Sequence, residues 1–127
     1  MILNIEGLSS PFPINRVQLE PYCEYKIRLI SLHAQLSEKV PAGIYKLTTN
    51  LIERELGSTS KILSYLTFDE RKRLITFCPR TKIWYKLKRK DFSTADVKLF
   101  SLTSDRELFF DQFSCQFEIR ETYGGFQ

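Results

Sequence analysis

The basic residues between positions 71 and 90 are the part of this 127-residue sequence best suited to binding chemistry. They are Arg71, Lys72, Arg73, Arg80, Lys82, Lys86, Lys88, Arg89 and Lys90, and no acidic residue interrupts them. The net charge of the whole chain is only +4, so the remainder is net negative. Trp84 lies inside this basic block, and an aromatic ring among cations can stack on a base while the cations contact phosphate. The basic block therefore predicts a candidate contact with an anion or with nucleic acid.

Other interpretations of the basic block stay open. Lysines also blunt exposed strand edges against aggregation, and a basic surface can meet the acidic part of a neighbouring subunit. Strand alternation places Trp84 and Lys86 on one face and Tyr85 and Leu87 on the other. Trp84 is then expected at the surface if Tyr85 enters the core. Trp84 with Tyr85 is also the candidate aromatic platform of a glycan-binding or receptor-binding module, such as a fibre head.

Catalytic chemistry finds little support in the sequence. The single histidine, His33, ends a predicted strand, and no Ser-His-Asp arrangement can be argued around it. Cys23, Cys78 and Cys115 are widely spaced and form no metal-ligand pattern, so we expect buried or half-buried thiols. No phosphate-binding glycine loop occurs. We expect no enzyme activity, cofactor, metal or small-molecule substrate.

The composition predicts one folded domain over residues 1–127. Apolar residues make up 43% and aromatic residues 13% of the chain, which excludes a disordered protein. No apolar run approaches the roughly 20 residues of a membrane-spanning helix, and the start of the sequence lacks the pattern of a signal peptide. We therefore expect synthesis in the cytoplasm or nucleus, without secretion and without a membrane partner.

Alternating side chains from Tyr25 to Leu32 predict the longest strand, central in a sheet. Ile30 and Leu32 make its second face apolar as well, so we expect that end to be covered on both sides. The other predicted strands span residues 1–6, 16–19, 44–47, 61–68, 73–78, 83–87, 97–102, 108–110 and 115–123. Such a series of short strands indicates an all-β fold, an antiparallel β-sandwich or barrel.

The remaining segments are predicted as a short helix and as loops. One helix is expected near residues 50–56, capped by Thr49 or Asn50 and stopped by Gly57. Residues 88–94 are expected to loop out. Residues 1–15 are a candidate N-terminal arm, although residues 1–6 also fit an edge strand, and residues 124–127 form a loose tail.

Adjacent phenylalanines suggest self-association. Phe109 and Phe110 follow each other, so only one of the two can enter the core from a strand. The other is expected to be covered by a loop or by a partner chain. Phe109 and Phe110 are therefore candidate oligomer-interface residues.

Two stretches carry a resemblance to a known family. They are Y-K-I-R-L-I-S-L at residues 25–32 and V-P-A-G-I-Y-K-L-T-T-N-L-I at residues 40–52. Together they resemble the penton, or minor capsid, proteins of Polinton (Maverick) elements, adintoviruses and virophages. Pro41, Gly43 and Tyr45 match the P-x-G-x-Y turn of that family. Residues 33–39 replace its asparagine-rich loop, and residues 123–126 only weakly match its L-G-F motif.

The resemblance implies a single jelly roll of about eight strands that forms a homo-oligomer, a pentamer at the vertices of a virion, beside a major capsid protein. The basic block would then face packaged DNA or a neighbouring subunit. A nucleic-acid-binding β-barrel that uses residues 71–90, and a fibre-head-like receptor or glycan-binding module, stay open as alternatives.

Overall fold

The computed structural model describes residues 1–53 and 61–122. The strands are β1 (Ile2–Gly7), β2 (Phe12–Gln18), β3 (Glu24–Val40), β4 (Gly43–Thr49), β5 (Ile62–Phe68), β6 (Lys72–Phe77), β7 (Tyr85–Lys86), β8 (Asp91–Ala95), β9 (Val97–Ser101), β10 (Glu107–Leu108) and β11 (Phe110–Thr122). The described residues include no helix. The prediction of an all-β protein is therefore confirmed for this part of the chain.

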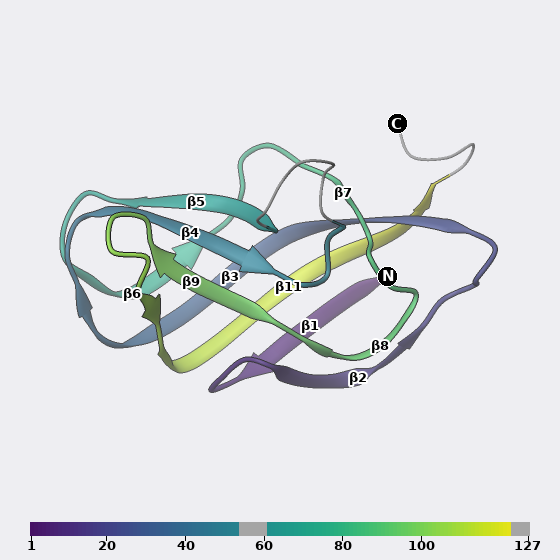
Figure 1. The fold of residues 1–127 in the computed structure, drawn as a ribbon, viewed down its shortest axis with the longest axis horizontal. Helices are drawn as coiled ribbons and strands as arrows, with labels where there is room; N and C mark the ends of the chain where they lie inside the picture. Colours follow the sequence, from purple (N-terminus) through teal and green to yellow (C-terminus); the bar gives the residue numbers. More distant parts are fainter. Residues whose placement is uncertain (54–60, 123–127) are drawn as a thin grey trace.

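The strands form three antiparallel sheets (Figure 1). The larger sheet has the order β1-β11-β3-β6, and β7 also pairs with β3. The smaller sheet has the order β10-β9-β4-β5, and β2 pairs with β8 in a third, two-stranded sheet. Only Asp96 separates β8 from β9, so one nearly continuous stretch of chain takes part in both the second and third sheets. This architecture is consistent with a β-sandwich.

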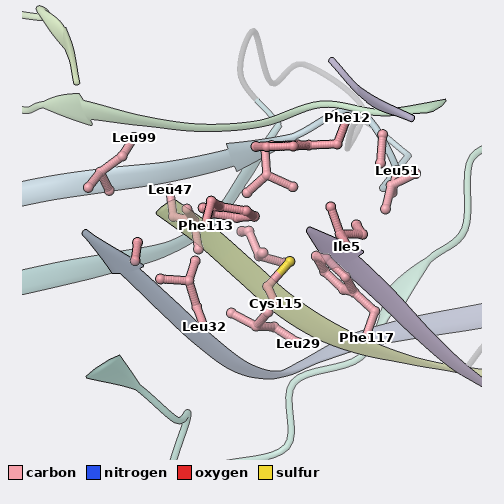
Figure 2. Close-up of a cluster of buried hydrophobic side chains, with 14 of the residues drawn as sticks. Ile5, Phe12, Leu29, Leu32, Leu47, Leu51, Leu99, Phe113, Cys115 and Phe117 are labelled. Carbon is pink, nitrogen blue, oxygen red and sulfur yellow. The ribbon is translucent and has the colours of Figure 1, made fainter. Parts of the chain in front are cut away.

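One hydrophobic core joins the sheets. Figure 2 shows Leu47 and Leu99 from the smaller sheet facing Leu32 and Phe117 from the larger one. These four side chains are at most 2% exposed. Alternating residues of each strand supply the core because successive side chains of a strand point to opposite faces. The other face of the larger sheet carries polar and charged side chains together with exposed apolar ones such as Leu74.

The central strand β3 is longer than predicted. It runs for 17 residues, past the predicted end at Leu32. Its pairing with β11 shifts at Ile30, so that Leu29 lies opposite Phe117 and Ser31 opposite Gln116. This β-bulge changes which residues face the core, from Leu29 to Leu32. The bulge turns Leu32 toward the core, on the same face as Leu29. The expectation that both faces are covered near Leu32 was therefore wrong.

The helix predicted near residues 50–56 is not present where the structure describes it. Ile52 forms a β-bridge with Leu87, and the Glu53 N–H donates to the Lys86 carbonyl. Bridging to the β7 segment outweighs the local capping signals. Leu51 and Ile52 are nevertheless buried. The rest of the predicted helix lies outside the described residues, as does the tail at 124–127.

Two further differences concern segments at the ends of strands. Residues 88–94 were predicted to loop out, but Asp91–Ala95 form β8 and pair with β2. Residues 1–15 include β1, which pairs with β11 along six positions and forms an edge of the larger sheet.

In the P-x-G-x-Y turn between β3 and β4, the Tyr45 hydroxyl donates to the Pro41 carbonyl at 2.7 Å. No helix of the described residues could span a membrane.

Candidate functional site on the outer face of the larger sheet

Three cations surround the indole ring of Trp84. The Lys26 Nζ lies 4.6 Å from the ring centroid, and the Cζ atoms of Arg28 and Arg120 lie 5.5 and 5.6 Å from it. Lys26 pairs with Arg120 across β3 and β11, and β7 begins one residue after Trp84. We call these four residues and Glu118 the Trp84 cluster. It lies on the face of the larger sheet that points away from the core.

Glu118 holds the two arginines of the Trp84 cluster in place. Arg28 Nε donates to Glu118 Oε1 and Arg120 Nε donates to Glu118 Oε2, each at 2.7 Å. Glu118 is only 9% exposed. Burial works to raise the pKa of Glu118, but the hydrogen bonds from Arg28 and Arg120 outweigh it and lower the pKa below its usual value. The carboxylate is therefore ionised at neutral pH and fixes both guanidinium groups.

The basic block does not form one patch. Lys86 pairs with Lys26 near the start of β3, whereas Lys72 pairs with Val40 at its end. At about 3.3 Å per residue these positions lie up to roughly 45 Å apart along the strand. Arg71 and Lys88 lie outside strands near these opposite ends. The cations of the basic block thus lie at two different ends of the molecule.

Several members of the basic block already have acidic partners. Arg73 pairs with Asp111 at 2.8 Å and also donates to the Leu36 carbonyl. The other pairs are Lys86 with Glu53 at 3.3 Å and Lys90 with Glu24 at 3.8 Å, and the Lys72 Nζ lies over the ring of Phe68. Arg71, Arg80, Lys82, Lys88 and Arg89 are exposed and form no ion pair with a described residue.

Both sequence predictions about neighbouring aromatic residues match the geometry. Leu87 is buried, Tyr85 packs against the core, and the Tyr85 hydroxyl donates to the Leu63 carbonyl, so Trp84 faces outward. Trp84 and Tyr85 consequently do not form a shared exposed platform. Phe110 packs against the core with its ring 4.9 Å from that of Phe113, whereas Phe109 is 61% exposed.

A hollow lies further along the outer face of the larger sheet. It has a volume of about 540 Å³, and the exposed Leu8 and Leu74 are among its lining residues. An adjoining hollow of about 200 Å³ shares Glu6, His33 and Ser114 with it. The His33 side chain is exposed and forms no hydrogen bond with a described residue. A histidine, a carboxylate and a hydroxyl line this surface, but no described contact aligns them for proton transfer.

A second hollow of about 540 Å³ lies beside β8. Its lining includes Arg89 of the basic block, and also Arg16 and Asp91. Arg16 donates to both carboxylate oxygens of Asp91, at 2.9 and 2.8 Å. The hydrogen bond from Arg16 lowers the pKa of Asp91. Because Asp91 neutralises Arg16, Arg89 is the cation of this hollow that has no described acidic partner.

The cysteines lie in three different environments. Cys115 is buried and Cys23 half-buried, but Cys78 is exposed, so the expectation of burial was wrong for Cys78. Burial raises the pKa of the Cys115 thiol well above its ordinary value. Within residues 1–53 and 61–122, no three His, Cys, Asp or Glu side chains gather to hold a metal.

The sequence predicts Trp84 at the surface among cations, but it does not identify Lys26, Arg28 and Arg120 as those cations. Lys26 and Arg28 belong to β3 and Arg120 to β11, far from Trp84 in the chain. Alternation in the sequence could have indicated these cations, because both arginines and Lys26 occupy the polar positions of strands with one apolar face. Pairing β11 with β3 would have brought them together.

The fold and the site define a class: an all-β protein built from antiparallel sheets, with a charged cluster and a hollow on one outer sheet face. Comparison of the chain with protein-family models, with curated proteins and with solved structures finds no match.

Proposed function

We propose that this protein is a structural capsid subunit of the penton, or minor capsid, type, a single jelly roll that associates with copies of itself. The resemblance of residues 25–32 and 40–52 to the penton proteins of Polinton elements, adintoviruses and virophages supports this proposal. In that role the chain forms a pentamer at the vertices of a virion beside a major capsid protein. It binds neighbouring chains and transforms no substrate.

The order of strand pairing supports a jelly roll. A jelly roll can be described as a long antiparallel hairpin rolled up, so that the first strand pairs with the last, the second with the next to last, and so on inward. When the two-residue strands β7 and β10 are set aside and the nearly continuous β8 and β9 are counted as one strand, β1 pairs with β11, β2 with β8, β3 with β6 and β4 with β5. The pair β3–β11 then joins β1–β11 and β3–β6 into the larger sheet, and the pair β4–β9 adds β9 to β4–β5 in the smaller sheet.

Two different exposed apolar features carry the proposal of self-association. A five-fold ring needs a head-to-tail interface, so each subunit must present two different, complementary surfaces. Phe109, 61% exposed, is a projecting apolar side chain. The hollow lined by Leu8 and Leu74, which are 66% and 70% exposed, is a concave apolar surface. We propose that Phe109 belongs to one side of the interface and this hollow to the other.

Two variants test this arrangement. In Phe109→Ser the projecting side is lost, and in Leu74→Ser the hollow is altered, so each purified variant is expected to be monomeric in sedimentation velocity. Each variant still has one intact side. An equimolar mixture should therefore form a heterodimer and no larger species, because the two altered sides remain at its ends.

The same experiment can contradict the proposal. Oligomers of unchanged size in both variants would show that these side chains do not form the interface. A mixture that stays monomeric would show that Phe109 and the hollow are not complementary. Tyr22→Ser is the matched control, because Tyr22 is 93% exposed and lines none of the described hollows; this variant should assemble like the unaltered protein.

A further inference from the structure

The Trp84 cluster has more cations than its one carboxylate can neutralise. Glu118 accepts hydrogen bonds from both Arg28 and Arg120. Lys26 has no acidic partner among the described residues, although its Nζ lies closest to the Trp84 ring. Like charges held this close repel each other, and an anion placed between them would relieve the repulsion. The cluster is therefore arranged to receive a negative group.

The surroundings of the cluster extend its positive charge along the surface. Lys82 and Lys88 flank Trp84 in the sequence, are exposed, and have no ion pair with a described residue. Lys86, opposite Lys26 in the sheet, is paired with Glu53 at 3.3 Å but is half exposed. A ligand with several regularly spaced negative charges fits such a track better than one small anion does.

We propose that the Trp84 cluster binds single-stranded nucleic acid. Lys26 moves from its place over the half-buried Trp84 ring to contact a phosphate, Arg120 contacts a second phosphate, and a base stacks on the ring face that Lys26 leaves. The aromatic ring favours nucleic acid over an acidic protein segment, since an acidic segment would need only the cations. This site differs from the basic block predicted from the sequence because four of its five members come from β3 and β11. It does not depend on the proposed capsid role.

Fluorescence anisotropy of a labelled oligothymidylate at low salt tests the site. Lys26→Gln is expected to weaken binding about fivefold, since one phosphate contact is lost while the Glu118 contacts remain. Trp84→Leu is expected to weaken it about tenfold or more through loss of stacking. Arg71→Gln removes the same charge at the opposite end of β3 and should change affinity less than about twofold.

The chain contains one tryptophan, so intrinsic fluorescence reports on this site directly. The oligonucleotide should quench Trp84 emission in the unaltered protein and in Phe109→Ser, which separates this site from self-association. Circular dichroism melts verify that the variants are folded.

Absence of binding at low salt would overturn the proposal. Equal losses in Lys26→Gln and Arg71→Gln would also overturn it, because they would indicate attraction by net charge alone. Polyglutamate that competes with equal affinity, and with the same dependence on Trp84, would identify an acidic protein segment as the ligand instead.

Discussion

Glu118 fixes the positions of two arginines on the outer face, Arg28 and Arg120. Its two carboxylate oxygens accept from arginines that belong to different strands, β3 and β11. Without this carboxylate, Arg28 would be held near Lys26 and Arg120 with no compensating charge. A nearly buried glutamate on the outer face of a sheet therefore serves both the stability of the fold and the geometry of the Trp84 cluster.

Replacing Glu118 by glutamine should destabilise the protein in a pH-dependent way. Because the pKa of Glu118 is lower in the fold than in the unfolded chain, its ionised form stabilises the fold above the unfolded-state pKa of about 4.3. This stabilisation is lost as the pH falls through the folded-state pKa. Urea unfolding should show Glu118→Gln to be clearly less stable than the unaltered protein at pH 7, with the difference shrinking toward about pH 2.

Glu70→Gln is the matched control, because Glu70 is exposed and has no ion pair with a described residue. It should leave stability nearly unchanged at every pH. A stability difference for Glu118→Gln that is constant with pH would contradict the role assigned to the ionised carboxylate.

Single positions of the site could be predicted only in part. Alternation from Trp84 to Leu87 was enough to place the indole at the surface and Leu87 in the core. The neighbours of Trp84 could not be identified, because they depend on the register between β3 and β11. A shift of one residue in that pairing would have placed different side chains beside the ring.

Strand β3 shows why element boundaries were harder to predict than strand content. Its alternating pattern was recognised from Tyr25 to Leu32, but the strand continues to Val40. The polar residues Ser37–Lys39 resemble a link in the sequence, yet the strand continues through them, because Leu36 before them pairs with β11 and Val40 after them pairs with β6. The bulge at Ile30 reverses the alternation, which the sequence expresses only as apolar residues at Ile30 and Leu32 on the second face of the strand. Tertiary pairing also replaced the predicted start of a helix at residues 51–53 with a bridge to Leu87.

The connection between β1 and β2 depends on the absence of a side chain at Gly7. A Cβ atom at Gly7 would lie 2.8 Å from the Phe12 ring, which is fully buried and stacked on Phe113 at 4.6 Å. Gly7→Ala should therefore displace the ring and lower the free energy of unfolding by about 1–3 kcal/mol beyond the backbone cost. Equilibrium urea denaturation measures this difference.

Gly43→Ala separates the steric effect from the backbone effect. Gly43 has a φ of 154°, close to the 156° of Gly7, but a Cβ there would approach no atom closer than 4.0 Å. Both variants bear a similar backbone cost, so only Gly7→Ala includes the clash. Equal losses of stability in the two variants would contradict the packing role of Gly7.

Across the whole molecule, the two proposed contact regions are built from different residues. The Trp84 cluster involves the first half of β3, where Lys26 and Arg28 lie, whereas the hollow of the proposed interface includes His33 and Gln35 further along it. Phe109 is anchored next to the final part of β3, because its carbonyl accepts from the Ser37 N–H. One long strand thus supports both regions, and self-association can leave the Trp84 cluster accessible.

A capsid subunit of the proposed type must assemble with copies of itself. Native mass spectrometry of the unaltered protein over a range of concentrations tests this assembly most directly. We predict a closed oligomer of defined size, a pentamer, that Phe109→Ser converts to monomer. A strict monomer at every concentration, identical in the unaltered protein and in Phe109→Ser, would contradict the account.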